Sequence, residues 1–307
     1  MSGNQRAVRP VVLGIAGDSA AGKTTLADGI ARILGPERVT ILCTDDYLRC
    51  SRWERERNGL SALDPRSNYV DILEQHLRLL RNGEPILKPR YHHEDGTLGP
   101  PEYVEPREYL LLEGLLSCST DALREACDVK VFLEPDATLR RDWKIRRDCD
   151  QRGYALAEVV ESLENPRQDD TDRVQSQRAF ADIVVQFYRS GPLQGETGGS
   201  LNVRTTLRPT LPHPDLTPIL DIGVQNGLRL DLSRDEDGNP VDVLEIMGDI
   251  DDHRAGAMEA LLWGLIPGAA PPGSAGVGQF VDGANGLKSS HSLALSQLLV
   301  AYHLPRA

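Results

Sequence analysis

The chain has 307 residues, of which 40% are hydrophobic and 26% charged, a composition typical of folded globular proteins and not of disordered ones. Its formal net charge of −12 argues against a broad basic face that coats DNA or RNA. No apolar run approaches the roughly 18 residues of a membrane helix, and the N-terminus lacks the apolar core of a signal peptide. We therefore expect a cytoplasmic protein of about two domains that binds neither nucleic acid nor membranes.

Strand-like and helix-like patterns alternate through the first 190 residues. Continuous apolar runs predict strands, and the 3.6-residue periodicity predicts helices. The expected strands are 11–16, 39–43, 109–112, 129–133 and 181–188, and the expected helices are 23–34, 69–80, 136–152 and 156–163. This alternation predicts an α/β fold with a mostly parallel sheet flanked by helices.

The composition changes after residue 190. The segment 190–200, SGPLQGETGGS, is polar and glycine-rich and predicts a linker. Beyond it we expect strands at 201–209, 227–232 and 241–247, helices at 253–265 and 289–302, and a long loop at 267–286. The predicted organisation is an N-terminal domain of residues 1–192 and a smaller C-terminal α+β extension of residues 201–307.

Five cysteines are present: Cys43, Cys50, Cys118, Cys127 and Cys149. Their number is odd, and no two of them form a CxxC pair. This spacing predicts reduced thiols and gives no support to a zinc knuckle.

A phosphate-binding loop is predicted by residues 17–24, GDSAAGKT, which match GxxxxGK[ST] between an apolar strand and a helix. In such a loop, backbone N–H groups surround the β-phosphate, the lysine reaches the β/γ oxygens and the hydroxyl ligates Mg²⁺. The alternative is a glycine turn with an incidental lysine. Because no NKxD signature is present, we expect ATP rather than GTP. The residues expected to bind ATP here are Gly17, Asp18, Ser19, Ala20, Ala21, Gly22, Lys23, Thr24 and Thr25.

Carboxylates follow two of the predicted strands. Asp45 and Asp46 come after strand 39–43, at the edge of an α/β sheet where ligands bind, and one of them could accept a hydroxyl proton. Their alternative role is a turn or helix cap. Glu113 ends strand 109–112, as a carboxylate beside Mg²⁺ would, or as an ordinary strand terminus.

Two further polar segments are candidates for anion binding. Lys144, Arg147 and Asp148 share one face of helix 136–152, which Arg140 and Arg152 extend. This face could clamp a transferring phosphoryl group, or it could be an ordinary solvated charged helix. The segment 88–93, KPRYHH, could bind sugar or phosphate or form a surface loop. Its paired histidines do not predict a metal site, because no third ligand has matching spacing.

Taken together, these segments resemble the phosphoribulokinase/uridine kinase family of P-loop kinases, especially its plant and cyanobacterial phosphoribulokinase branch. The resemblance rests on GDSAAGKTT, DDY, ALDPRSNYVDIL, KPRYHHEDG, PPEYVEP, LLLEGL, WKIRRDCDQRG and VLEIMGDID. It implies a P-loop kinase fold, use of MgATP, and phosphorylation of D-ribulose 5-phosphate to ribulose 1,5-bisphosphate. It also implies a homodimer.

The resemblance assigns roles to individual residues. Asp45 matches the base that deprotonates the C1 hydroxyl, and Arg52 matches an arginine that binds the sugar phosphate. Glu113 and Thr24 match the Mg²⁺ site. Five residues match family positions that stabilise the transferred charge and help close the ATP site: Lys23, Lys144, Arg147, Asp148 and Arg152. Two residues match positions that line the acceptor pocket: Tyr91 and His93.

Two departures from the family pattern stand out. Leu48 occupies the position of a family histidine, which weakens acceptor binding or changes the acceptor, with Arg49 or Arg55 as possible substitutes. Light-regulated relatives pair a cysteine of the phosphate loop with one just before the catalytic aspartate. Cys43 occupies the second of these positions, but Ala21 occupies the first, so we expect no thioredoxin-type control through that disulfide. The alternatives are a related kinase for another sugar phosphate or nucleoside, and a non-catalytic nucleotide-binding relative.

Overall fold

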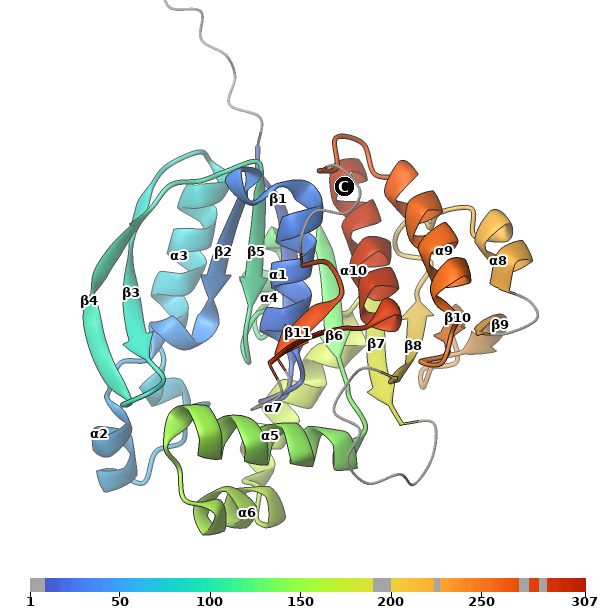
Figure 1. Ribbon diagram of the computed structural model, residues 1–307. Coiled ribbons are helices and arrows are strands. Elements are labelled where there is room, and N and C mark those ends of the chain that lie inside the picture. Colours follow the sequence, from blue (N-terminus) through green and yellow to red (C-terminus); the bar gives the residue numbers. More distant parts are fainter. Residues whose placement is uncertain (1–8, 190–199, 224–226, 271–275, 282–285) are drawn as a thin grey trace, which may run out of the picture.

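A single eight-stranded sheet in the order β2-β5-β1-β6-β7-β8-β10-β9 runs through the molecule (Figure 1). The computed structural model describes residues 9–189, 200–223, 227–270, 276–281 and 286–307. The predicted linker at 190–200 therefore lies outside the described residues, apart from residue 200. Within the described part, no helix is long and apolar enough to span a membrane.

The first five strands of this order are parallel, as predicted. They are β1 (Val11–Gly17), β2 (Val39–Cys43), β5 (Tyr109–Glu113), β6 (Val129–Leu133) and β7 (Ile183–Tyr188). Their apolar runs are continuous because helices cover both faces of the sheet, so neither side of a strand needs polar residues.

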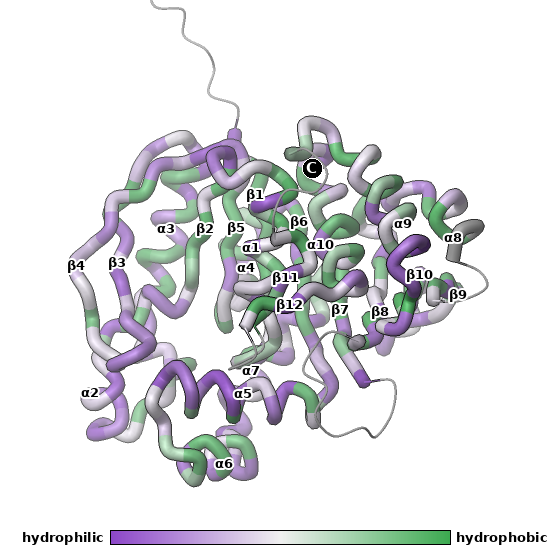
Figure 2. The backbone as a smooth tube through the Cα atoms, viewed as in Figure 1, coloured by the Kyte–Doolittle hydropathy of each residue, from purple (hydrophilic) through white to green (hydrophobic). Residues whose placement is uncertain are grey.

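Alternate residues of β1 and β5 supply two separate cores. Leu13 and Leu111 pack in the core that contains α1 (Lys23–Leu34), α9 (Asp252–Gly264) and α10 (His291–His303). Val12 and Leu110 pack in the opposite core with α3 (Val70–Arg81) and α4 (Asp121–Ala126). Figure 2 shows the hydrophobic residues concentrated along these central strands. The period of two residues along each strand is what directs successive side chains to opposite layers.

The C-terminal part extends the same sheet instead of forming a second one. β8 (Asn202–Leu207), β10 (Pro240–Ile246) and β9 (Leu228–Arg234) continue from β7 with antiparallel pairing. Helix α8 (Thr217–Gly223) packs against α9 and β9. The division into two domains near residue 195 stays a prediction.

Several short elements were not predicted. β3 (Ile86–His92) and β4 (Thr97–Val104) form a hairpin outside the main sheet, so the surface-loop alternative for 88–93 is wrong. Three prolines interrupt the strand pattern of this hairpin and conceal it from periodicity. Also missed were α2 (Arg52–Arg57), α4 and α7 (Gln168–Gln175), together with α8. Each has eight residues or fewer, too few to show a helical period.

The predicted long loop at 267–286 is only partly correct. Its described residues include β11 (Gln279–Val281), which pairs with β12 (Leu287–Ser289). Ser289 therefore ends a strand, and the final helix begins at His291 instead of residue 289. A three-residue strand carries too little pattern to be recognised from sequence.

Two helices lie across the carboxyl ends of the parallel strands: α5 (Ala137–Arg152) and α6 (Leu156–Glu164) (Figure 1). Figure 2 shows α5 to be mostly hydrophilic. Its only buried side chains are Leu139 and Asp148. Apolar packing therefore contributes little to its position, and its polar contacts matter correspondingly more.

The contact between α1 and α10 leaves no room for a side chain at Gly29. A Cβ there would lie 2.0 Å from the side-chain amide carbon of Gln297. Gln297 is fully buried, donates from Nε2 to the carbonyl of Thr25 (3.0 Å) and accepts at Oε1 from the N–H of Gly278 (2.7 Å). Because both ends of the amide are held, it cannot move aside without losing hydrogen bonds.

We therefore expect Gly29→Ala to lower the free energy of unfolding by about 2 kcal/mol, through overpacking. A glycine-to-alanine change in an unobstructed helix instead stabilises by about 1 kcal/mol. Gly256→Ala in α9 is the matched control, since a Cβ there meets no atom of the described residues within 4 Å. Denaturant titration of both variants measures the difference, and equal stabilisation by the two changes would contradict the packing argument.

His303, at the end of α10, is a buried imidazole whose ring lies edge-on to that of His213 at 5.3 Å. Its Nε2 has no hydrogen-bond partner among the described residues. Burial, and then the neighbouring His213, lower the pKa of His303 from 6.5 to about 4. Asp182 acts in the opposite direction and Arg306 in the same one. Between these two pKa values the unfolded chain binds more protons than the folded protein.

The neutral His303 therefore makes its full contribution to the free energy of unfolding above pH 6.5. This contribution is lost as the pH falls toward 4. We expect the titration of His303 to lower the free energy of unfolding by about 2 kcal/mol between pH 7 and pH 5. Urea titrations at the two pH values, on the native protein and on His303→Gln, isolate this part because carboxylate titration is common to both. Exposed His253→Gln is the control and should leave the pH dependence unchanged.

Candidate active site

The phosphate-loop motif has the backbone that its sequence predicts. Gly17 ends β1 at φ +146°, where a Cβ would lie 2.5 Å from the carbonyl oxygen of Leu133. Gly22 has φ +91°, and Ala20 also has a positive φ, 62°. These conformations turn the chain tightly between strand and helix, which favours glycine at positions 17 and 22. Thr24 and Thr25 lie in the first turn of α1.

Lys23 lies inside the loop and is only 8% exposed. Its Nζ donates to the carbonyl oxygens of Gly17 (3.1 Å) and Asp18 (2.8 Å). Burial lowers the pKa of Lys23, and the nearby carboxylates of Asp45 and Glu113 oppose that change. The ammonium group is thus held at the loop by carbonyls that an anionic ligand can replace.

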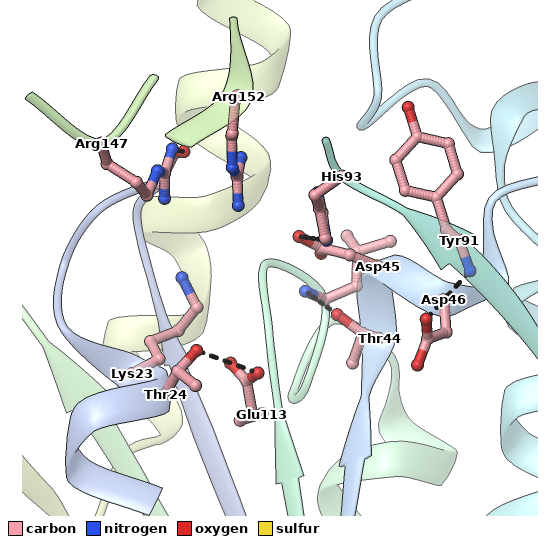
Figure 3. Close-up of polar contacts among 12 residues, drawn as sticks. Lys23, Thr24, Thr44, Asp45, Asp46, Tyr91, His93, Glu113, Arg147 and Arg152 are labelled. Carbon is pink, nitrogen blue, oxygen red and sulfur yellow. Dashed lines mark hydrogen bonds and ion pairs between the residues drawn. The ribbon is translucent and has the colours of Figure 1, made fainter. Parts of the chain in front are cut away.

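Glu113 and Thr24 form a pair of oxygen donors beside Lys23 (Figure 3). Thr24 Oγ1 donates to Glu113 Oε1 at 3.2 Å. Burial raises the pKa of Glu113, and Lys23 acts against this rise. A hydroxyl and a carboxylate are ligands that suit Mg²⁺ and not a soft metal, so these residues fit the metal expected from the sequence.

Asp45 and Asp46 differ sharply in their surroundings, although both lie in the short 3₁₀ turn η2 (Thr44–Tyr47). Asp46 pairs with the ammonium group of Lys88 and accepts from the backbone N–H of Tyr91 at 3.0 Å. Asp45 Oδ2 lies 3.9 Å from Nε2 of His93 and faces the cavity described below (Figure 3). Asp46 therefore anchors the hairpin, and Asp45 is the carboxylate available to a ligand.

A buried carboxylate organises the charged face of α5. Asp148 is 3% exposed. Its Oδ2 accepts from Lys144 Nζ at 2.6 Å, and its Oδ1 accepts from Arg147 Nε at 2.8 Å, with Arg152 Nη1 at 3.7 Å. Burial alone would raise the pKa of Asp148, but Arg147 and Lys144 lower it overall. The alternative of a solvated charged helix is wrong for this face.

Polar contacts also join α5 to the phosphate loop. Arg147 donates from Nη2 to Ser19 Oγ at 2.8 Å. Arg140 Nη1 lies 3.7 Å from Asp18 Oδ2, which also accepts from Gln175 of α7 at 3.2 Å. In Figure 3 the guanidinium groups of Arg147 and Arg152 lie over Lys23, so this helix concentrates positive charge at the loop.

A cavity of about 400 Å³ opens beside Asp45. Its lining includes residues from the phosphate loop, η2, α2, β3, α5 and α6: Ser19, Asp45, Leu48, Arg52, Arg55, Asn68, Tyr91, His93, Lys144, Asp148, Arg152, Tyr154, Glu158 and Ser162. The volume is that of a small-molecule site. The lining carries four cations, Arg52, Arg55, Lys144 and Arg152, and four carboxylates, Asp45, Glu56, Asp148 and Glu158. Asp148 is already paired with Lys144, and the two arginines of α2 remain as groups that can meet an anionic part of a ligand.

The arginines of α2 are held in place on the cavity wall. Arg52 lies over the ring of Tyr154 at 4.2 Å and donates to the carbonyl of His93 at 2.6 Å. Its Nε is buried with no hydrogen-bond partner in the described part of the chain. Arg55 donates to the hydroxyl of Tyr91 at 2.9 Å. A preorganised guanidinium with an unused N–H is well suited to a phosphate.

The surroundings of His93 favour its neutral form. Burial, followed by the positive charge of Arg152, lowers the pKa of His93, and Asp45 only partly opposes them. A neutral imidazole keeps one nitrogen free to accept a hydrogen bond or bind a metal.

The sequence missed some of these residues and misplaced others. Tyr154, Glu158 and Ser162 were not predicted; the sole sequence signal was that Tyr154 follows the helix stop at Gly153. Lys88 was a candidate for anion binding, but its ammonium group forms an ion pair with Asp46. Arg49 stacks on a tyrosine ring away from the cavity lining, so of the two possible substitutes for the missing histidine only Arg55 reaches the cavity.

All five cysteines are free thiols, as predicted. Cys43 ends β2 and hydrogen-bonds to Glu113. Burial, then the charges of Asp45 and Glu113, raise its pKa well above that of an ordinary thiol. In the described structure Cys43 thus has a proton-bearing side chain beside the site and no disulfide partner.

Comparison with known proteins identifies the family to which the N-terminal part of the chain is similar. The sequence model described as "Phosphoribulokinase / Uridine kinase family" matches residues 12–192. Phosphoribulokinase of Synechocystis sp. is 35% identical over 196 residues, which cover 64% of this chain and 59% of that protein. Chloroplastic phosphoribulokinase of Arabidopsis thaliana is 29% identical over 216 residues, 64% of this chain and 55% of that protein. The chain therefore spans less than two thirds of these relatives' length.

Two other relatives complete the comparison. Uridine kinase of Alkaliphilus metalliredigens is 33% identical over 181 residues, 58% of this chain and 87% of that protein. The solved phosphoribulokinase from Rhodobacter spheroides superposes with a TM-score of 0.57 at 19% identity, covering 84% of this chain and 96% of that one. At this identity the superposition shows a common fold over most of the chain.

Replacing each of the adjacent aspartates should separate structure from chemistry. Asp46→Asn leaves Lys88 buried without its main counter-charge, so we expect a loss of about 3 kcal/mol in unfolding free energy. Asp45→Asn, at a partly exposed cavity position, should change it by about 0.5 kcal/mol or less. Denaturant titration measures both, and equal losses in the two variants would refute the assignment of Asp46 as the anchor.

Proposed function

This chain belongs to the phosphoribulokinase/uridine kinase family, and from that premise we propose that it transfers the γ-phosphoryl group of ATP to D-ribulose 5-phosphate, giving ribulose 1,5-bisphosphate and ADP. The observation that carries the proposal is the cavity between Asp45 and the arginines of α2 and α5. It lies directly beside the phosphate loop, and three arginines and one lysine are among its lining side chains. The similarity to curated phosphoribulokinases supports the same acceptor.

ATP binding is assigned to the loop of residues 17–25. The N-terminus of α1 and the loop N–H groups favour a polyphosphate. Lys23 would exchange its carbonyl contacts for phosphate oxygens. Arg147 and Arg152 of α5 would neutralise the negative charge of the phosphates.

Thr24 and Glu113 would hold Mg²⁺. When bound, Mg²⁺ neutralises charge on the phosphates. The two side chains already lie in hydrogen-bond contact and bear hard oxygen donors. The buried position of Glu113 raises its affinity for a proton in the metal-free protein, and a cation beside it would remove that tendency.

In the proposed reaction Asp45 is the general base. The C1 hydroxyl oxygen forms a bond to the γ-phosphorus, the bond from that phosphorus to the ADP oxygen breaks, and Asp45 accepts the hydroxyl proton. Lys23 and Lys144 stabilise the charge of the transferring group. Asp148 acts as a positioning residue because it holds Lys144, Arg147 and Arg152.

The acceptor phosphate is assigned to the arginine side of the cavity. Arg52 has a buried Nε with no partner in the described chain, and Arg55 adjoins it through Tyr91. His93 and Tyr91 line the space between this side and Asp45. A phosphate held by Arg52 would leave the opposite end of a five-carbon sugar free to reach Asp45.

The second candidate acceptor is a nucleoside. It is favoured by the match to uridine kinase, which covers 87% of that protein, and by Leu48 in the cavity wall. A neutral nucleoside has no negative charge to pair with Arg52, Arg55 and Arg152, so we prefer the sugar phosphate as the acceptor.

We further propose that the protein is a cytoplasmic homodimer. Strand β9 lies at the edge of the sheet and carries Leu232, which is 86% exposed. An edge strand with an exposed apolar side chain is suited to pairing with another copy.

An acceptor panel tests the proposed function. Purified protein with MgATP should release ADP strongly with ribulose 5-phosphate, and weakly with ribose 5-phosphate or uridine. Stimulation by uridine would favour the second candidate. ATP binding without stimulation by any acceptor would indicate a non-catalytic relative and refute the proposal.

The proposed base is tested by Asp45→Asn. We expect turnover to fall by about 10³-fold, because general-base catalysis typically supplies 10²–10⁴-fold, while ATP affinity stays unchanged. Steady-state ADP release and equilibrium binding of a fluorescent ATP analogue measure the two effects. Asp71→Asn, an exposed carboxylate in α3, is the control. Near-normal turnover of Asp45→Asn would remove Asp45 as the base.

A further inference from the structure

Three potential metal ligands of different kinds meet on the acceptor side of the site. The side chains of Cys43, Asp45 and His93 each offer a ligand atom, and these atoms all lie within 4.8 Å of one another. The separation between His93 Nε2 and Asp45 Oδ2 is 3.9 Å. Figure 3 shows the imidazole of His93 directed at the Asp45 carboxylate. The residues come from chain segments about 50 positions apart, which is why no ligand spacing was visible in the sequence.

The fold holds these segments together independently of any ligand. Cys43 ends β2, Asp45 lies in the turn that follows, and His93 follows β3. Asp46 ties that turn to β3 through Lys88 and the backbone N–H of Tyr91. The relative position of the three ligand atoms therefore rests on a buried ion pair between their two segments.

The ligand set differs in kind from the proposed Mg²⁺ site. Thr24 and Glu113 provide oxygens only, whereas this set has one sulfur, one nitrogen and one oxygen. Thiolate and imidazole select Zn²⁺ over Mg²⁺. In tetrahedral Zn²⁺ sites, bond lengths of about 2.0–2.3 Å place ligand atoms about 3.3–3.8 Å apart. The present separations of up to 4.8 Å reach this range by a contraction of about 1.5 Å at most.

We propose that Cys43, Asp45 and His93 bind one Zn²⁺ per chain, separately from the Mg²⁺ site. Binding forms bonds from the metal to Cys43 Sγ, an Asp45 oxygen and His93 Nε2. The thiol proton, now hydrogen-bonded to Glu113, leaves to solvent, and water fills the fourth position. If Asp45 is the base, as the proposed function has it, bound Zn²⁺ occupies the lone pair that would take the hydroxyl proton and inhibits transfer.

Direct metal binding tests the site without using the kinase reaction. Zn²⁺ is titrated into metal-free full-length protein in competition with a chromogenic chelator. We expect one tight site per chain, weakened at least tenfold in Cys43→Ser and in His93→Gln. The matched controls are Cys50→Ser and His92→Gln, since His92 lies against Gly99 and outside the ligand set. Circular dichroism confirms that each variant is folded.

Cobalt(II) gives a second readout that reports the sulfur ligand itself. The native protein and both controls should show thiolate-to-cobalt charge-transfer absorption, which Cys43→Ser should abolish. Absence of this absorption in the native protein, or unchanged Zn²⁺ affinity in both ligand variants, would overturn the proposal. Because neither measurement contains ATP or acceptor, these failures are distinct from failure of the kinase proposal.

Discussion

The register of three parallel strands, β2, β5 and β1, sets where the charged groups on the sheet side of the site lie. Glu113 pairs with Ile15 on one side and with Cys43 on the other. The chain segments that continue from these strands, the phosphate loop and the turn of Asp45, therefore emerge on either side of one buried carboxylate. A slip of one residue would turn Glu113 to the opposite face and separate Lys23 from its counter-charges. The apolar residues that alternate along the same strands oppose such a slip.

Above this edge, α5 is held by charge more than by apolar contact. Leu139 is its only buried apolar residue, and Asp148 is its only buried charged one. Removing Asp148 from water is costly, and three cations offset that cost while turning their remaining donors toward the loop. An element with so little apolar burial opens at low free energy compared with the core strands. This is consistent with the role proposed for α5 over a bound nucleotide.

Adjacent residues of the same type have different roles in two places. Of the two aspartates, Asp46 binds the hairpin through Lys88 and the backbone of Tyr91, whereas Asp45 faces the cavity. Of the two histidines, His92 lies against Gly99, whereas His93 faces Asp45. In each pair the backbone directs one side chain toward the hairpin and its neighbour toward the cavity. The buried pair of Lys88 with Asp46 thus supports both the acceptor cavity and the juxtaposition of Cys43 with His93.

The sequence alone determined the parallel sheet, the phosphate loop and the charged face of α5. These are local features: a continuous apolar strand, a glycine pattern and an i, i+4 spacing each reside within about ten residues. It did not decide between the two aspartates, between a solvated and a buried face at Asp148, or between a loop and a strand at 88–93. Those choices depend on which segment packs against which, and the hairpin that decides most of them lacks a clear period because prolines interrupt it. The cavity wall from α6 and the cluster of Cys43, Asp45 and His93 were likewise settled only by tertiary structure, since their members are distant in the chain and meet through long-range packing.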